Sequence, residues 1–443
     1  MAITGIPLDE NLIRDTVAET GVGPPYSASI REIVQLVNRL EFKTGLKFIR
    51  MEMGVPGLPA PGIGVEAEIA ALKEGVASSY PNINGIPGLK KEASRFIKLF
   101  TGLDINPRGC IPTVGSMMGA MVVFLVANRN DRTKEGTLFI DPGFPVQKQQ
   151  VKMLGHDYYS FDVYNHRGKK LREKVESYFK TGLISSVLFS NPNNPSWICL
   201  TEEELAIIGE LCTEYDVIAV EDLAYFGMDF RKDYSVPGRP PYQPSIGNYT
   251  DDYVMLVSSS KIFSYAGQRI GIMAISDHLF DRPFPDLLRY YSTEKFGHSA
   301  VFGALYGLSA GVSHSAQYGL ASLLKAVNDG EYNYRDDVIV YGEKARIMKR
   351  LFTQNGFRIV YDHDLDEPLA DGFYFTISYP GMTGNELIEK LLRYGISAIS
   401  LDATGSERQE GLRACVSLIP QNQFADLEFR LKRFSEDNRV NKD

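Results

Sequence analysis

Residues 253–271 read YVMLVSSSKIFSYAGQRIG, and the interpretation of the whole chain starts from this stretch. Its first five residues are apolar or aromatic and predict a buried β-strand. Three serines and Lys261 follow directly, and Arg269 comes eight positions after the lysine, between Gly267 and Gly271. A lysine at the end of a strand is usually a solvated surface residue, so the meaning of Lys261 depends on what the rest of the chain brings to it.

Three further apolar runs follow the same plan, since each is short and ends in polar residues: GTLFIDP (136–142), SSVLFSNP (185–192) and DVIAVED (216–222). Two segments between these runs have apolar residues at helical spacing: LREKVESYFK (171–180) and EEELAIIGELCTEY (202–215). Strands that alternate with helices predict βαβ units. We therefore expect an α/β fold whose large domain has a mostly parallel sheet with helices on both faces.

The pattern changes after residue 310. A long helical run, DDVIVYGEKARIMKRLFTQNG, is followed there by short apolar segments typical of strands: FRIVYD, GFYFTISY and LRACVSLI. This predicts a smaller α+β domain built from both ends of the chain. We expect residues 1–65 to form an N-terminal arm and part of this small domain, residues 66–315 the large ligand-binding domain, and residues 316–443 the C-terminal small domain.

Composition excludes several classes of protein. The 443 residues carry a formal net charge of −8 and no block of basic residues, which disfavours nucleic acid and anionic membrane surfaces as partners. The longest apolar stretch, GAMVVFLVA (119–127), is too short to span a bilayer, and the first residues show no pattern of a signal peptide. Four scattered cysteines predict a reduced, cytoplasmic setting, and no group of residues has the spacing of metal ligands.

Polar residues stand at the end of each predicted strand: Asp141, Asn191, Asp222 and Ser258. In open parallel sheets, ligands bind at the carboxyl ends of the strands. Four separate segments of the chain are therefore expected to direct polar groups toward one crevice.

A lysine at such an edge can do covalent chemistry. When its ammonium group is desolvated it loses its proton readily, and the amine can then form a Schiff base, most characteristically with pyridoxal 5'-phosphate. That cofactor also needs a phosphate site and a carboxylate for its ring nitrogen. Arg269 and Ser258 are candidates for the phosphate, as is the start of a predicted helix in TVGSMMGAMVVFLV (113–126), and Asp222 is a candidate for the ring nitrogen.

These residues resemble the pyridoxal phosphate-dependent aminotransferases of class I/II, the aspartate aminotransferase type of fold type I. That family has a serine-rich segment, a Schiff-base lysine and a G-x-R motif eight residues later. Other segments are similar to family motifs in the same order along the chain: ASSYPNINGIPGLKKEASRF, DPGFPVQKQQ, SNPNNPSW, EDLAYFGMDF and GLRACVSL. The resemblance covers about residues 54–418 and implies an aspartate aminotransferase-like fold, with an amino acid and a 2-oxo acid as substrates.

The resemblance also assigns roles around the cofactor ring. It implies that Lys261 is the Schiff-base lysine and moves the substrate proton, and that Asp222 keeps the ring nitrogen protonated. Asn194 and Tyr225 are then the partners of the phenolic oxygen, and Phe144 is the side chain stacked on the ring.

Further roles concern the phosphate, the partner subunit and the substrate. The phosphate is assigned to Ser258, Arg269 and the turn of Gly115, Ser116 and Met117. Tyr80 is similar to a tyrosine that reaches the phosphate of the neighbouring subunit, which implies a homodimer with shared active sites. Arg413 is expected to clamp the substrate α-carboxylate, with Asn194 and Gly54 also on the substrate side.

The chain departs from the family pattern in three places. Ser196 and Trp197 stand where Thr-Gly is usual, Gln268 stands where many members have tryptophan, and the loop GVPGLPAPGIG (54–64) lacks the usual acidic and aromatic residues. These departures bear on the substrate rather than on cofactor binding. Arg108, Arg239, Arg289 and Lys295 are equal candidates for a side-chain carboxylate, so the amino donor stays open.

Three other functions remain to be weighed against transamination. A β-lyase (C–S lyase) or a decarboxylase would use the same cofactor residues on the same fold. A regulator fused to a DNA-binding module is disfavoured, because the segment before residue 54 is short and lacks a basic helical pattern. A nicotinamide enzyme is disfavoured because PGIGVEA (61–67) follows a proline-rich loop rather than a strand.

Overall fold

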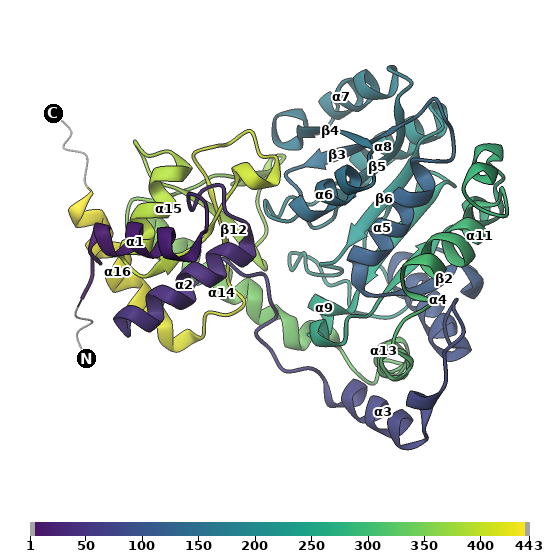
Figure 1. Cartoon of the computed structure of the whole chain (residues 1–443), viewed down its shortest axis with the longest axis horizontal. Coiled ribbons are helices and arrows are strands. Elements are labelled where there is room, and N and C mark those ends of the chain that lie inside the picture. The colour runs from purple at the N-terminus through teal and green to yellow at the C-terminus, as the bar shows by residue number, and fades with distance from the viewer. Residues whose placement is uncertain (1–4, 439–443) are drawn as a thin grey trace. The chain divides into compact units, whose positions relative to one another are not determined.

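The four apolar runs of the sequence form strands of one seven-stranded sheet in the computed structural model, which describes residues 5–438 (Figure 1). The strand order is β2-β8-β7-β6-β5-β3-β4, and β8 runs antiparallel to its two neighbours while the other strands are parallel. The strands are β2 (Cys110–Thr113), β3 (Gly136–Asp141), β4 (Asp157–Asp162), β5 (Ile184–Ser190), β6 (Ile218–Leu223), β7 (Tyr253–Ser258) and β8 (Gly271–Ile275). The predicted α/β fold with a mostly parallel sheet is confirmed.

Both faces of this sheet are covered, as the burial of β6 shows. Successive residues of a strand point to opposite faces, so Val220 and Asp222 share one face and Glu221 points to the other. Val220 belongs to the large apolar core built around helix α5 (Gly115–Ala127). Glu221 accepts hydrogen bonds on the opposite face from Ser245 Oγ (2.6 Å) and the Ile246 amide (3.2 Å).

The chain divides into two compact units, which are described separately. One contains the seven-stranded sheet and consists of Leu58–Asn193 and Cys199–Val338. The other consists of Met1–Gly57, Asn194–Ile198 and Ile339–Asp443, of which residues 5–57, 194–198 and 339–438 are described. The domain boundaries after residues 65 and 315 stay a prediction.

The unit with the large sheet also contains most of the helices. Their bounds are α3 (Gly62–Lys73), α4 (Pro87–Thr101), α6 (Pro145–Met153), α7 (Lys170–Phe179), α8 (Glu202–Glu214), α9 (Ser259–Ile262), α10 (Asp277–Asp281), α11 (Phe296–His298), the π-helix η7 (Ser299–Leu305), α12 (Tyr306–Ser309) and α13 (His314–Asn328). Short 3₁₀ turns are η1 (Val76–Ser78), η2 (Pro107–Gly109), η3 (Val163–His166), η4 (Ile246–Asn248), η5 (Ala266–Gln268) and η6 (Pro285–Arg289). Within residues 5–438, no helix combines the length and apolarity that a membrane span needs.

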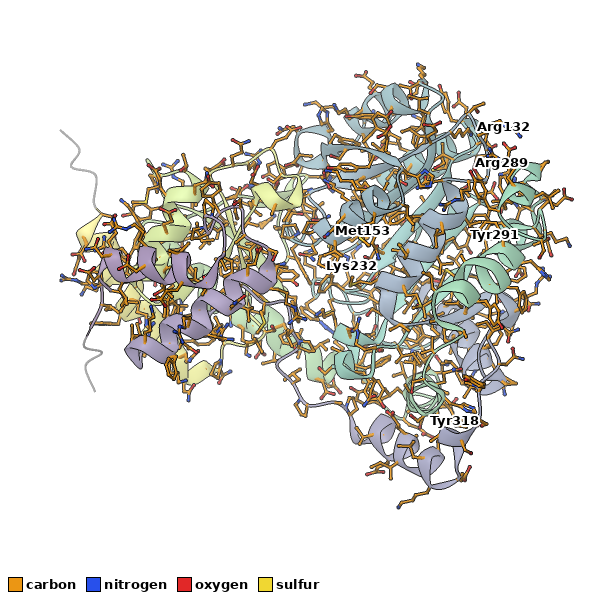
Figure 2. The ribbon with its side chains drawn as sticks, viewed as in Figure 1. Arg132, Met153, Lys232, Arg289, Tyr291 and Tyr318 are labelled. Atoms are coloured by element: carbon orange, nitrogen blue, oxygen red, sulfur yellow. The ribbon has the colours of Figure 1, made fainter. Side chains whose placement is uncertain are left out.

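Ion pairs at the surface of this unit tie its helices and turns together. Arg132 and Arg289 both pair with Asp286, at 2.8 and 3.5 Å, and the hydroxyl of Tyr291 donates to the Leu125 carbonyl (3.0 Å) (Figure 2). The segment that follows β8 is thereby attached to the end of α5. Exposed pairs of this kind contribute little stability individually, so the buried core is the main source of stability.

The second unit is built from both ends of the chain. Its four-stranded antiparallel sheet has the order β14-β15-β12-β9, and a separate parallel pair joins β1 to β13. Its elements are α1 (Glu10–Thr20), α2 (Ile30–Thr44), β1 (Ile49–Arg50), β9 (Arg358–Ile359), β10 (His363–Asp364), β11 (Glu367–Pro368), β12 (Tyr374–Ser378), α15 (Gly384–Arg393), β13 (Ile396–Ser397), β14 (Ile399–Ser400), η8 (Asp402–Thr404), β15 (Leu412–Cys415), η9 (Gln421–Gln423) and α16 (Phe424–Asp437). Helix α14 (Tyr334–Gln354) carries most of its residues in this unit.

One buried arginine fastens the two chain ends of this unit to each other. Arg430 of α16 donates to the Lys47 carbonyl (2.8 Å), which comes from the N-terminal part of the chain. It also donates to the Gly395 carbonyl (2.7 Å) and pairs with Asp426 (2.7 Å). Because its charge is paired and its donors are used, this arginine can be buried without a large penalty.

Gly271, the first residue of β8, is packed tightly between β7 and the start of α5. A Cβ at this position would lie 2.9 Å from the Val257 carbonyl oxygen and 3.4 Å from the Ser116 amide nitrogen. Both neighbours are backbone atoms held by the sheet and by the start of α5, so they cannot move aside easily.

We expect Gly271→Ala to lower the free energy of unfolding by about 1–3 kcal/mol, because the added methyl group is overpacked against fixed backbone. Gly267→Ala is the matched control, since a Cβ there would meet nothing within 4 Å. Denaturant unfolding of the two variants checks this. Equal stability of the two variants would contradict the packing described for Gly271.

Candidate active site

The register of the large sheet brings the predicted site residues to one edge. Asp222 of β6 lies opposite Ser190 of β5 and Leu256 of β7, and Ser258 lies opposite Gly271 of β8. Gly271 also lies opposite Thr113, the last residue of β2. The carboxyl ends of β6 and β7 and the turn after β2 are therefore joined through adjacent strands, as expected for a ligand site in an open parallel sheet.

Asp222 is a buried carboxyl group with two hydrogen-bond donors. The Gln147 side-chain amide donates to Oδ2 (2.8 Å), and the Ala224 backbone amide donates to Oδ1 (3.1 Å). Burial raises the pKa of Asp222 from 3.8 to about 6, although both hydrogen bonds favour the ionised form. A carboxyl group in this state becomes fully ionised when a cation is placed beside it, so it suits a protonated ring nitrogen.

Lys261 lies in the short helix α9, directly after β7, and is half-buried. Ser258 caps this helix, because its Oγ accepts from the Ser260 amide (3.2 Å). Ser259 Oγ donates to the Ile270 carbonyl (2.6 Å) and so ties the lysine turn to the segment that enters β8. The base of the lysine side chain is thereby held between two strands of the sheet.

The turn before α5 has the properties of an anion site. Gly115 has a φ of +68°, a left-handed conformation that favours glycine, and a Cβ on it would lie 2.8 Å from Arg269 Nη2, so the guanidinium group lies directly against this turn. Ser116 Oγ is buried and has no hydrogen-bond partner among residues 5–438. Helix N-terminal amides, an unpartnered hydroxyl and an arginine together fit a phosphate group.

Arg269 and Met117 complete the description of this turn. Arg269 is exposed, adopts a φ of +50° and donates from Nη1 to the Ala266 carbonyl (2.9 Å). Met117 lies in the first turn of α5, and its carbonyl accepts from Gln150 Nε2 (2.8 Å). Its side chain is exposed, so its contribution to an anion site is the backbone amide.

Phe144 and Tyr225 each lie close in sequence to Asp222 or to its hydrogen-bond partner Gln147. Phe144 is half-buried at the N-cap of α6, three residues before the glutamine that contacts Asp222. The next residue of that helix, Lys148, forms an ion pair with Asp141 at the end of β3, which fixes α6 against the sheet. Tyr225 is buried and lies two residues after the end of β6.

Arg413, Gly54 and Asn194 belong to the other unit, where Arg413 is a buried cation. Its side chain is 2 % exposed, Nη2 donates to the Glu52 carbonyl (2.5 Å), and its guanidinium lies 4.8 Å from the centre of the Tyr374 ring. Nε has no hydrogen-bond partner within the described chain, and no carboxylate there pairs with this arginine. A buried guanidinium in this state is a binding site for an anion.

Gly54 adjoins the same ring, because a Cβ on Gly54 would lie 1.9 Å from the Tyr374 hydroxyl. Asn194 is buried at the start of the segment 194–198, which packs within this unit. The structure thus gathers Gly54 and Arg413 around Tyr374 in one unit, and Lys261, Asp222 and the turn at Gly115 along one sheet edge in the other.

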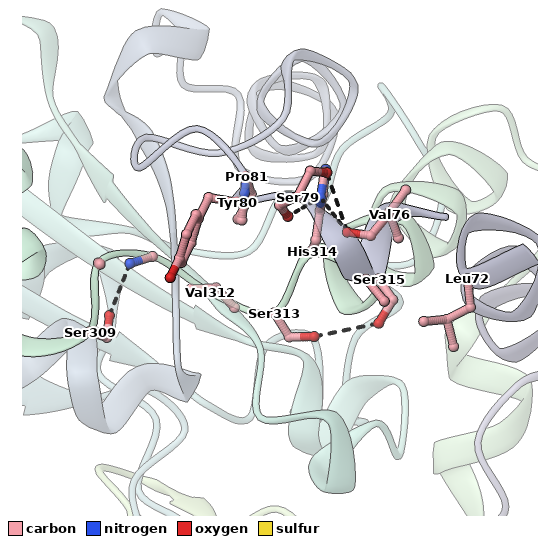
Figure 3. A pocket seen from close by; sticks show the side chains of 13 residues that line it. Leu72, Val76, Ser79, Tyr80, Pro81, Ser309, Val312, Ser313, His314 and Ser315 are labelled. Carbon is pink, nitrogen blue, oxygen red and sulfur yellow. Dashed lines mark hydrogen bonds between the residues drawn. The ribbon is translucent and has the colours of Figure 1, made fainter. Parts of the chain in front are cut away.

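Tyr80 is 95 % exposed and has no buried role within this chain. It lies on the rim of a hollow of about 400 Å³ between the segment 72–81 and the segment 309–315 (Figure 3). In the same hollow, His314 Nδ1 lies 3.2 Å from the carbonyl oxygens of Val76 and Ser79.

Three of the four cations considered for a side-chain carboxylate are already paired. Arg108 pairs with Asp281, Lys295 lies 3.6 Å from the same aspartate, and Arg289 lies 3.5 Å from Asp286. Among the described residues, no group of three or more His, Cys, Asp or Glu side chains could hold a metal ion.

Sequence reasoning missed three residues that shape these sites: Gln147, Tyr374 and Trp197 as a packing partner of Tyr374. The segment DPGFPVQKQQ was singled out only for Phe144, yet Gln147 lies one helical turn later and is buried. That spacing was the available signal for Gln147. Tyr374 had no such signal, because an aromatic residue in a strand is ordinarily core.

Comparison with known proteins places this geometry in a family. The family model described as aminotransferase class I and II matches residues 59–425. A probable aspartate aminotransferase of Methanocaldococcus jannaschii is 27% identical over 348 residues, which cover 73% of this chain and 85% of that protein. The aspartate aminotransferase of Pyrococcus horikoshii is 24% identical over 372 residues, covering 82% and 83%.

Solved structures agree on the fold. The alanine aminotransferase from Pyrococcus furiosus superposes with a TM-score of 0.74 at 20% identity, over 95% of this chain and 99% of that one. An aminotransferase from Mycobacterium tuberculosis gives a TM-score of 0.75 at 18% identity, over 94% and 98%.

We expect Gln147→Leu to raise the pKa of Asp222 further, since it removes a hydrogen bond that favours the charged form. An acid whose pKa is higher in the folded state lowers stability as the pH rises above its unfolded pKa of 3.8, until it is fully ionised. The destabilisation by Gln147→Leu is therefore larger at pH 8 than at pH 5, by about 1–3 kcal/mol.

Unfolding of the cofactor-free protein as a function of pH measures this difference. Gln149→Leu is the matched control, because Gln149 is exposed on the same helix. A destabilisation by Gln147→Leu that does not change with pH would show that the amide does not act on the charge of Asp222.

Proposed function

The chain belongs to the aminotransferase class I and II family and is a pyridoxal phosphate-dependent transaminase, and we propose that Lys261, Asp222 and Tyr225 are its catalytic residues. The observation that carries the proposal is one sheet edge, where Asp222 ends β6, Lys261 follows the neighbouring β7, and Gly271 of β8 lies between Ser258 and the turn at Gly115. No second part of the described chain offers this combination of a buried acid, a lysine and an anion site.

The bound cofactor supplies an electron sink for the negative charge that develops on the substrate carbon. Asp222 favours this by holding a proton on the ring nitrogen, because a cation beside it relieves the cost of its own buried charge. Lys261 is the residue that would hold the cofactor covalently through its amine, as the Schiff-base lysine. The same amine would accept the proton that leaves the substrate carbon and would return it in the reverse half of the exchange.

The remaining residues hold the cofactor in place. The amides of Gly115, Ser116 and Met117, with Ser258 and Arg269, bind its phosphate. Phe144 stacks on the ring from the start of α6, where Gln147 ties that helix to Asp222. Tyr225 and Asn194 donate to the phenolic oxygen of the ring.

Arg413 binds the α-carboxylate of the amino acid and of the 2-oxo acid. The support for this is its burial without a carboxylate partner in the described chain, together with its contact with Tyr374. Gly54 and Asn194 complete this substrate side. Relatives are named for aspartate, aromatic amino acids, alanine and diaminopimelate. They therefore share amino-group transfer but differ in the amino acid for which they are named.

We also propose that the protein works as a cytoplasmic homodimer with shared active sites. Tyr80 is exposed at a hollow that this chain leaves open, and a second copy would cover it. In the dimer, the Tyr80 hydroxyl reaches the cofactor phosphate of the other subunit.

We expect borohydride reduction of the cofactor-loaded protein to attach the cofactor permanently to the peptide that contains Lys261, as read by mass spectrometry. Lys261→Ala abolishes this label and lowers transaminase activity by at least about a hundred-fold, because both the covalent attachment and the proton carrier are lost. Lys98→Ala, at an exposed lysine of the same unit, is the control. A label on a different lysine would overturn the assignment.

Shared sites predict complementation between two inactive variants. Lys261→Ala and Tyr80→Ala, when co-expressed, form mixed dimers in which one of the two sites has both Lys261 and Tyr80. We expect these mixed dimers to recover activity above that of either parent, with sedimentation confirming two chains per particle. A protein that sediments as a monomer, or mixed dimers without recovery, would contradict the proposal.

A further inference from the structure

We propose that Trp197 is a positioning residue for substrate carboxylate recognition: it supports Tyr374 against the Arg413 guanidinium and anchors the segment that begins at Asn194. The inference rests on the proposed binding of the substrate α-carboxylate by Arg413. It adds Trp197, a side chain that does not itself contact the carboxylate. All residues in the argument belong to the same structural unit.

The backbone of Trp197 is held in an unfavourable conformation. Its φ is +66°, in the left-handed region that suits glycine and is rare for a bulky residue. Its side chain is nevertheless fully buried, with 0 % exposed. A strained backbone persists only where surrounding contacts determine it, and such positions concentrate at functional sites.

The indole ring of Trp197 is held by a glycine directly beneath it. A Cβ on Gly372 would lie 1.9 Å from Trp197 Cε2 and 2.2 Å from Cζ2, so the ring rests on the Gly372 backbone. Gly372 comes two residues before Tyr374, and the Trp197 ring meets the Tyr374 ring edge-on at 6.2 Å and 67°. The tryptophan therefore supports the start of β12 and one side of the tyrosine ring.

Tyr374 has further contacts, of which one is the ring of Phe373, edge-on at 5.1 Å and 72°. The Arg413 guanidinium lies 4.8 Å from the centre of the Tyr374 ring, and the tyrosine hydroxyl group meets the backbone of Gly54. Arg413 also donates a hydrogen bond to the Glu52 carbonyl (2.5 Å). The guanidinium therefore packs on the tyrosine ring, and Trp197 is one of the aromatic side chains that hold this ring.

The same tryptophan lies within the short segment that carries Asn194. Residues 194–198 group with the unit that contains Arg413, and Ser196 Oγ accepts from the Ile198 amide (3.2 Å) to close a local turn around Trp197. Movement of the indole ring would therefore shift both Asn194 and the support of Arg413. This gives a physical role to the departure from the Thr-Gly pattern that is usual at residues 196 and 197.

The test compares carboxylate binding across variants of the cofactor-loaded enzyme. The probe is propionate, a carboxylate without an amino group, measured as a competitive inhibitor, with KM and kcat for one amino donor measured alongside. We expect Trp197→Gly to raise the propionate inhibition constant by about ten- to a hundred-fold, because a misplaced binding group loses affinity steeply, and to raise KM more than it lowers kcat. Trp197→Phe, which keeps an aromatic ring, restores most of the affinity.

Two further variants keep the test decisive if Trp197→Gly folds poorly. Tyr374→Leu removes the ring under the guanidinium and is expected to weaken propionate binding as Trp197→Gly does. Phe434→Leu is the control for stability alone, because Phe434 is buried in the same unit among Phe357, Tyr379 and Tyr394. It is expected to lower the melting temperature without changing propionate binding.

Trp197 also reports on its own site, since it is the only tryptophan of the chain. We expect propionate to change the tryptophan fluorescence of the wild-type enzyme and to leave that of Arg413→Gln unchanged. If Arg413→Gln does not weaken propionate binding, the proposed role of Arg413 is wrong. If Arg413→Gln weakens it while Trp197→Gly and Tyr374→Leu bind as wild type, the role of Arg413 stands and the inference about Trp197 is wrong.

Discussion

The buried carboxyl group of Asp222 is the constraint on which the proposed cofactor site depends. The sheet removes it from water, which raises its pKa to about 6, and gives it only two hydrogen bonds in return. Its neighbour on the other face, Glu221, is a second buried acid whose pKa is raised to about 7. Such groups lower stability as they ionise, and a cation bound beside Asp222 would offset that cost. The strands beside β6 then carry what the rest of the cofactor needs.

The two units contribute different chemistry, and each builds its part by local packing. In one, strand ends and the start of α5 provide backbone amides, the lysine and the buried acid. In the other, β12 and β15 hold a buried arginine against an aromatic ring, and a strained tryptophan supports that ring. The first set suits a group that is the same in every reaction of the family. The second set suits the α-carboxylate that every amino acid and 2-oxo acid carries, and it includes Trp197, where this chain departs from the usual sequence pattern.

Much of the fold could be predicted from the sequence, because it follows from local patterns, whereas the roles of the site residues came from the family resemblance and stay predictions. Short apolar runs ending in polar residues identified β3, β5, β6 and β7, and parallel packing placed their ends together. Gln147 was missed because its role depends on which side of α6 meets the sheet, a tertiary fact. The stack of Trp197, Tyr374 and Arg413 joins three segments that are distant in sequence. The indole ring fits there because Gly372 has no side chain at the place that the ring occupies. The amino donor was beyond prediction, because most of the cations considered for it are paired at the surface.

The most direct measurement of the central claim is the stoichiometry of a half reaction. The cofactor-loaded protein is incubated with single amino acids and no acceptor, and both the 2-oxo acid and free ammonia are quantified against the cofactor content. The account predicts about one equivalent of 2-oxo acid for each cofactor and no free ammonia, since the amino group stays on the enzyme until an acceptor arrives. Continuous release of ammonia together with a 2-oxo acid would contradict it and identify an elimination reaction instead.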